Sequence, residues 1–187
     1  ALTLESAITL ESIYLKNGFK GWAVNGTPVD CVKIALNSIL DNVPDLIISG
    51  INHGANVGSN LIYSGTVASA YEGAMLGIPS IAISLASYKI RNFDCSKVVA
   101  RHIVEYVLEN KPPKGSMLNV NVPDLDIKSL KGYRITRQGN QFFKDDFEKR
   151  ENPRKKKYFW LKGEIIDKDT SIDFDGRSIS EGCVSIT

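Results

Sequence analysis

Hydrophobic and polar residues follow two different periods along the chain, and these periods mark the predicted strands and helices. Short apolar runs bounded by turn-forming residues are typical of buried strands, whereas apolar residues that recur three and four positions apart are typical of helices packed on a sheet. The pattern predicts strands at residues 19–24, 45–49, 80–84 and 117–122, and helices at residues 28–42, 67–76 and 95–109.

Local signals fix where these helices begin and end. Thr27 is a good N-cap and Pro28 suits the first helical position, while Gly77 and Pro79 stop the second helix. Residues 45–84 then read as a strand, a glycine-rich loop, a helix and a second strand, which make a βαβ unit. Its crossover is expected to be right-handed, with the loop at the carboxyl edge of the sheet, where ligands bind in such folds.

The character of the sequence changes after Arg137. Residues 144–157 are densely charged around Pro153, and an aromatic run follows at 158–160. The pattern predicts a hairpin, and two interpretations stay open: a solvated hairpin, or an arm whose aromatic half is covered by another subunit. We expect residues 1–137 to form an α/β core that is incomplete at its N-terminus. Residues 138–187 are expected to form the hairpin arm and a C-terminal β segment of the same single domain.

The composition argues against a nucleic-acid-binding protein and against a membrane-spanning one. The 187 residues include 23 Lys and Arg against 21 Asp and Glu, so the net charge of +2 gives no general attraction to nucleic acid or to a membrane surface. No apolar run approaches the roughly 20 residues that span a bilayer. Three scattered cysteines favour a reduced compartment, and we predict a soluble, cytoplasmic protein. Because the chain opens without Met in sequence that already looks structured, we expect a further N-terminal piece.

The candidate chemistry lies between residues 50 and 66. Ser64, Gly65 and Thr66 open a predicted helix, whose unpaired N–H groups and hydroxyls could hold a phosphoryl group; an ordinary helix cap is the alternative. Asn52 offers a neutral oxygen suited to Mg²⁺ or Mn²⁺, although it could equally stabilise a turn. The sequence has no P-loop and no nucleophile elbow, and a Ser-His-Asp triad is not expected with only two histidines.

These residues resemble the SurE (survival protein E) family along the whole chain. The resemblance is carried mainly by two elements at a specific spacing, SGINHGANVG at residues 49–58 and YSGTVASA at residues 63–70. Further matching segments are GTPVDCV at 26–32, IPSIAIS at 78–84, LNVNVP at 118–123, TRQ at 136–138 and EGCVSIT at 181–187.

The resemblance implies a Rossmann-like three-layer core with a mostly parallel sheet, and a C-terminal hairpin exchanged between copies in dimers or tetramers. It implies a divalent-metal-dependent phosphatase that converts nucleoside 5′- and 3′-monophosphates to nucleoside and phosphate. Carried over residue by residue, Asn52 matches a metal ligand, Ser64, Gly65 and Thr66 match phosphate contacts, and Asn56 is a weaker match.

One part of the family pattern has no counterpart in this sequence. The family holds its ion with an adjacent pair of Asp in an Asn-Asp-Asp-Gly motif near its start and with a Ser on a later loop, and neither is present here. The catalytic residues are therefore expected outside this chain, which we predict to be inactive alone. The alternative is a non-catalytic nucleotide-binding or assembly protein.

Overall fold

A five-stranded sheet lies at the centre of the computed structural model, which describes residues 2–16, 18–89, 92–169 and 171–187. β3, β4 and β5 run parallel to one another, β9 is antiparallel to β5, and β6 is parallel to β9. This arrangement confirms the predicted α/β class with a mostly parallel sheet. In spatial order the strands are β3 (Ile47–His53), β4 (Ser80–Ala86), β5 (Leu118–Pro123), β9 (Val184–Ile186) and β6 (Tyr133–Ile135).

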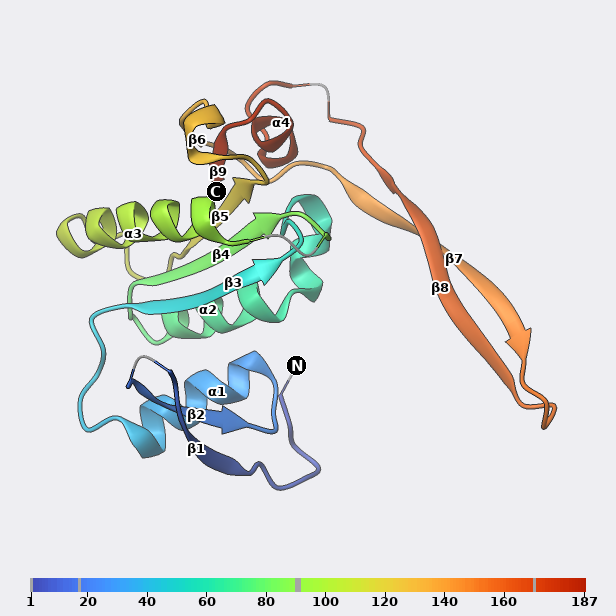
Figure 1. Cartoon of the computed structure of the whole chain (residues 1–187), viewed down its shortest axis with the longest axis horizontal. Helices are drawn as coiled ribbons and strands as arrows, with labels where there is room; N and C mark the ends of the chain where they lie inside the picture. Colours follow the sequence, from blue (N-terminus) through green and yellow to red (C-terminus); the bar gives the residue numbers. More distant parts are fainter. Residues whose placement is uncertain (1, 17, 90–91, 170) are drawn as a thin grey trace.

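Helices cover both faces of this sheet (Figure 1). α3 (Asp94–Glu109) lies on one face and α2 (Gly65–Met75) on the other, which gives three layers. α1 (Pro28–Ile34) continues into a π-helical turn, Ala35–Ile39, and packs against α2. A separate antiparallel pair, β1 (Leu10–Tyr14) and β2 (Lys20–Val24), precedes α1 in the chain.

The main core fills the space between the sheet and α3. Ile81 and Ile83 on β4 and Val120 and Val122 on β5 are fully buried, and they pack against the apolar face of α3 that carries Val99. Strands buried on both faces read as continuous apolar runs, which is why β4 and β5 were predictable from sequence. Among the described residues no helix is long and apolar enough to cross a membrane.

The start of α1 follows its sequence signals. Thr27 caps the helix, and the Asp30 carboxylate accepts hydrogen bonds from the Thr27 N–H at 2.7 Å and from the Thr3 hydroxyl at 2.7 Å. These bonds, the Thr3 hydroxyl first among them, hold the pKa of Asp30 well below its usual range. Asp30 therefore ties the N-terminal segment to α1.

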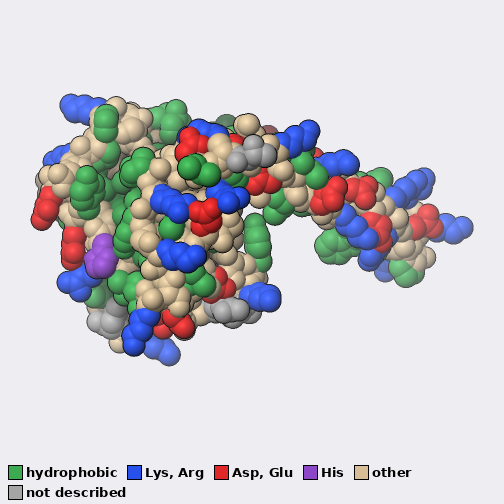
Figure 2. Space-filling model, turned by 90° about the horizontal axis from the view of Figure 1, so that it is seen from above, with side chains coloured by type: hydrophobic (Ala, Val, Ile, Leu, Met, Phe, Trp, Pro, Cys, Tyr) green, Lys and Arg blue, Asp and Glu red, His purple; other side chains and the backbone are tan. Residues whose placement is uncertain are grey.

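The predicted hairpin is present as a long arm, β7 (Phe142–Glu151) and β8 (Lys157–Ile166), which projects away from the core (Figure 1). Acidic and basic side chains are interspersed along it, with hydrophobic side chains exposed between them (Figure 2). Phe147, Phe159 and Trp160 are each more than half exposed. At its base, Arg137 binds Asp169 through two hydrogen bonds of 2.7 and 2.9 Å.

Several elements differ from the sequence prediction. β1 was not predicted, and the first helix with its π-helical turn ends at Ile39 rather than at residue 42. β3 does not end at Ser49 but continues to His53, so the first part of the predicted loop is strand. A short helix, α4 (Asp175–Ser180), lies in the segment for which only extended structure was predicted. Within the segment where a C-terminal β segment was predicted, the strand β9 lies in the central sheet between β5 and β6. Short 3₁₀ turns, η2 (Gly58–Tyr63) and η3 (Ile127–Ser129), complete the described elements.

Candidate functional site

A pocket of about 350 Å³ opens beyond the carboxyl ends of the parallel strands. All five sequence-predicted residues line it: Asn52, Asn56, Ser64, Gly65 and Thr66. The remaining lining residues are Pro28, His53, Gly54, Ala55 and Tyr88. The structure thus brings the candidate residues together at the edge of the sheet where the βαβ topology predicts a ligand site.

The N-terminus of α2 forms one wall of the pocket. Ser64 is the N-cap, and its Oγ accepts a hydrogen bond from the Val67 N–H at 3.2 Å. Because the Ser64 oxygen acts there as an acceptor, its O–H remains able to donate to a ligand. Gly65 and Thr66 occupy the first two helical positions, whose N–H groups have no partner within a helix. The wall therefore presents hydrogen-bond donors at the positive end of the helix dipole.

Asn52 forms a second wall, at the end of β3. Its Nδ2 donates to the Gly54 carbonyl at 2.9 Å, so its Oδ1 is the atom left to meet a cation or a donor. The bend before it depends on Gly50, where φ is +120° and a Cβ would lie 2.3 Å from the Ile83 carbonyl oxygen. Gly50 lets β3 shift register and carry Asn52 to the pocket. Beside it, the exposed His53 ring stacks on Phe93 with centroids 4.7 Å apart.

Asn56 is far less accessible than the other candidates, with 7% of its surface exposed. Its Nδ2 donates to the Ser84 hydroxyl at 2.7 Å, which leaves Oδ1 as its remaining polar atom. A phosphate oxygen needs a donor, and Nδ2 carries a second N–H that could serve as one with the amide in its present orientation.

The loop that carries Asn56 is also attached to the base of the arm. Gly58 donates its N–H to the buried Asp175 carboxylate at 2.8 Å and accepts at its carbonyl from Gln138 Nε2 at 3.0 Å. The Asp175 carboxylate binds the Gly139 N–H as well, at 3.0 Å. Gly58 is needed here, since φ is +56° and a Cβ would meet the Gln141 carbonyl oxygen at 2.3 Å.

Sequence reasoning alone did not find the residues that support the loop. These are Ser84 on β4, Asn119 and Asn121 on β5, and Asp175 on α4. The one available signal was the pair of asparagines within the apolar run LNVNVP, because polar residues inside a buried strand require partners. His102 is exposed, and its Nδ1 lies 3.1 Å from the Tyr133 hydroxyl.

The chain is similar to known proteins both in sequence and in fold. The family model "Survival protein SurE" matches residues 1–145. The chain belongs to the SurE family. Its whole length is 42% identical to 5′-nucleotidase SurE of Syntrophus aciditrophicus, of which it spans 71%, and 40% identical to the protein of that name from Christiangramia forsetii, of which it spans 73%. A SurE protein structure from Aquifex aeolicus superposes on the whole chain and on 75% of that protein, with a TM-score of 0.81 and 36% identity.

Membership of the SurE family confirms the resemblance predicted from the two motifs, and the individual roles of the pocket residues stay predictions. Asn52 Oδ1 is a neutral oxygen that could face a divalent ion. In the part of the chain that the structure describes, no group of three His, Cys, Asp or Glu could hold a metal. These residues by themselves do not fit a divalent cation, which requires carboxylate charge.

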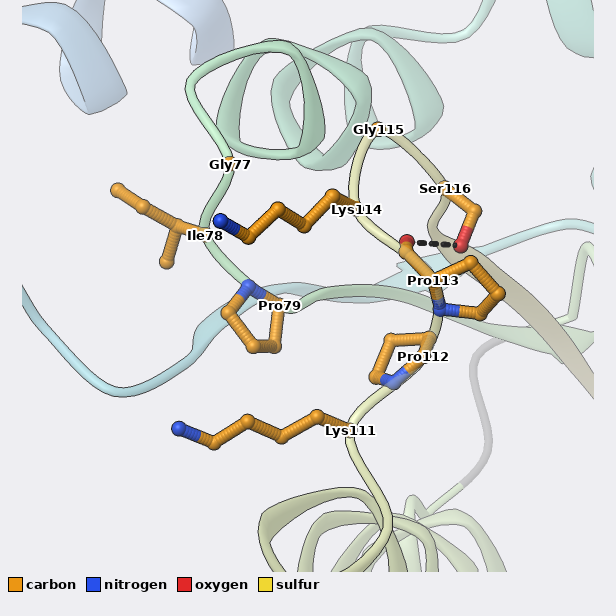
Figure 3. Close-up of a pocket in the computed structure, with 9 residues that line it drawn as sticks. All are labelled: Gly77, Ile78, Pro79, Lys111, Pro112, Pro113, Lys114, Gly115 and Ser116. Atoms are coloured by element: carbon orange, nitrogen blue, oxygen red, sulfur yellow. Dashed lines mark hydrogen bonds between the residues drawn. The ribbon is translucent and has the colours of Figure 1, made fainter.

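A second pocket lies at the opposite edge of the SurE core (Figure 3). It measures about 230 Å³ and lies where Gly77–Pro79 lead into β4 and residues 111–116 lead into β5. Lys111 and Lys114 extend in the same direction past Pro79. Because these segments precede the strands, the pocket is at the amino edge of the sheet, remote from Asn52 and α2's N-terminus, and it contains none of the predicted site residues.

Proposed function

We propose that this SurE-family protein is a nucleotidase that hydrolyses nucleoside 5′- and 3′-monophosphates to nucleoside and inorganic phosphate. One observation carries the proposal: the N-terminus of α2 and the loop asparagines converge on a single pocket at the carboxyl edge of the sheet. The names of its relatives, 5′-nucleotidase SurE, support the same activity.

In this proposal the chain's own residues bind and orient the phosphoryl group. The Ser64 hydroxyl and the N–H groups of Gly65 and Thr66 donate to the phosphoryl oxygens, and the dipole of α2 favours the charge that grows on them as water attacks. The P–O ester bond breaks, the water oxygen joins phosphorus, and a proton reaches the leaving nucleoside oxygen. The base that activates the water is not assigned to any residue of this chain.

Metal dependence is part of the proposal. Mg²⁺ or Mn²⁺ would supply Lewis acidity when bound, and Asn52 Oδ1 would provide one ligand. Because the described residues do not hold such an ion by themselves, no step is derived through it. A titration of phosphate release with Mn²⁺ tests this dependence.

One observation favours a second candidate. The described residues combine donors suited to a phosphate with no cluster of three metal-ligating side chains, and this is what a non-catalytic nucleotide-binding or assembly protein would have. Such a protein would bind AMP and leave it intact. The two candidates are therefore separated by turnover, not by affinity.

We further propose that the arm binds a second copy of the chain, within a cytoplasmic homo-oligomer, and that neither a membrane nor a specific nucleic acid is a partner. The exposed aromatic residues of β7 and β8 support this proposal, because soluble monomers seldom expose a contiguous apolar patch.

Release of phosphate tests the activity. The complete protein is incubated with 5′-AMP, 3′-AMP and β-glycerophosphate, with Mn²⁺ and without it, and inorganic phosphate is measured by a colorimetric assay. Release from both nucleotides is expected to exceed release from β-glycerophosphate. Tight AMP binding without phosphate release would favour the non-catalytic candidate, and absence of both would contradict the proposed function.

A further inference from the structure

Two asparagines lie inside the central strand β5 at positions where an apolar residue is usual. Asn121 has no exposed surface and Asn119 has 5%, and both alternate with the buried Val120 and Val122. A buried amide without partners is unfavourable by more than a hydrogen bond contributes, so the partners of these side chains indicate what they do.

Both side chains bind the backbone of one residue, Asn56. Asn121 Oδ1 accepts from the Asn56 N–H at 2.7 Å, and Asn121 Nδ2 donates to the Asn56 carbonyl at 3.0 Å. Asn119 Nδ2 donates to the same carbonyl at 2.8 Å. Ser84, the register partner of Asn121 on β4, then receives the Asn56 side chain at 2.7 Å.

These side-chain contacts hold the loop in place where no strand or helix hydrogen bonds do so. Residues 55–57 lie between the end of β3 and the turn η2, and they belong to no strand or helix. Their position is therefore set by side chains: Asn121 accepts a hydrogen bond from the Asn56 N–H, and Asp175 accepts one from the Gly58 N–H. Asn121 uses both of its polar atoms on Asn56, whereas Asn119 Oδ1 has no hydrogen-bond partner among the described residues. Asn121 is the better-matched anchor of the two.

We propose that Asn121 is a positioning residue for the pocket: its amide clamps the backbone N–H and carbonyl of Asn56 and so fixes the loop between Asn52 and Gly58 relative to the N-terminus of α2. Asn121 does not line the pocket and acts through Asn56. The inference rests on the proposed function for the identity of the ligand, a nucleoside monophosphate. The clamp itself is independent of that function.

The test compares two substitutions with a matched control. Asn121→Leu keeps a similar volume and removes both hydrogen bonds, and Asn121→Asp keeps the acceptor for the Asn56 N–H and removes the donor. Ser185→Ala is the control, because Ser185 is equally buried on the neighbouring strand and pairs with Asn121, while its hydroxyl binds Thr136 at 2.8 Å. Each variant is examined for its unfolding midpoint, amide hydrogen exchange at Asn56, and Kd for AMP and for inorganic phosphate.

Asn121→Leu is expected to speed exchange of the Asn56 amide and to weaken AMP binding by about tenfold or more, with Asn121→Asp intermediate. Ser185→Ala is expected to lower the unfolding midpoint and leave AMP affinity unchanged. Wild-type exchange and affinity in folded Asn121→Leu would overturn the inference, as would an equal loss of affinity in Ser185→Ala.

Two further outcomes are also decisive. Should Asn121→Leu not fold, Asn121→Asp, which loses only the donor to the Asn56 carbonyl, decides the matter: faster exchange around Asn56 with weaker AMP binding supports the clamp, and no change in either contradicts it. Should the wild type bind neither AMP nor phosphate, the proposed function fails, and the exchange comparison alone still decides whether Asn121 holds the loop.

Discussion

Replacing Ser64 by alanine separates a ligand-binding role of the α2 N-terminus from ordinary helix capping. Ser64 Oγ accepts from the Val67 N–H at 3.2 Å, and loss of such a cap costs about 1 kcal/mol. For a chain of this size that corresponds to a fall of about 2–4 °C in the unfolding midpoint. If the hydroxyl also donates to a phosphate, its loss removes a hydrogen bond to a charged group, which contributes about 1.5–3 kcal/mol. The Kd for AMP should then rise by about 10- to 150-fold.

Ser69→Ala is the matched control on the same helix. Ser69 is buried, and its hydroxyl donates to the Gly65 carbonyl at 2.9 Å and lies 2.7 Å from the Ser49 hydroxyl, so its loss also affects stability. It does not line the pocket. Both variants are examined by thermal unfolding and by isothermal titration with AMP. The reasoning is refuted if Ser64→Ala loses stability while its Kd stays within about twofold of that of Ser69→Ala.

Three other predictions address the loop, the arm and its base. In the complete protein, Asn52→Ala should abolish most phosphate release and raise the Mn²⁺ concentration needed for the remainder, with little change in folding; unaltered activity in a Mn²⁺ titration with a chromogenic phosphate ester would exclude Asn52 as a ligand. Deletion of residues 143–158 should reduce the assembly to a smaller species; light scattering that finds an unchanged mass, or a monomer before the deletion, contradicts the oligomer proposal. Arg137 holds the pKa of Asp169 below its usual range, so the stability that this pair contributes is complete at neutral pH and is lost as the pH falls below about 4. Asp169→Asn should therefore flatten the decline of the unfolding midpoint between pH 5 and pH 2, and an unchanged decline would show that the pair contributes nothing.

The parts of the fold that were predictable from sequence are those with local signals. Thr27 and Pro28 mark the start of α1, and Ser64 marks the start of α2. These signals are readable in the sequence because an N-cap side chain binds a backbone N–H only two or three residues further along. β9 carries no such signal: it has three residues, and its place depends on pairing with β5 and β6, far away in sequence. Helices as short as α4 depend on tertiary contacts more than on propensity.

The site, too, has parts with local sequence signals and parts that depend on residues far apart in the chain. The glycine-rich motif and the start of α2 identified the pocket's lining, because both lie within one βαβ unit. Gly50 looked like the start of a loop, yet its close approach to Ile83 lets the strand continue to His53. The contact between Asn121 and Asn56 joins residues 65 positions apart, and nothing in either segment specifies the other.

The central claim is that the N-terminus of α2 binds the phosphoryl group of a nucleotide. Titration of ¹⁵N-labelled protein with AMP tests it directly, because the amide resonances report each N–H separately. The account predicts saturable shifts at Gly65 and Thr66, reproduced by inorganic phosphate, with Gly115 at the amino-edge pocket unmoved. Shifts confined to residues 111–116, or none at Gly65 and Thr66 at saturating AMP, would contradict it.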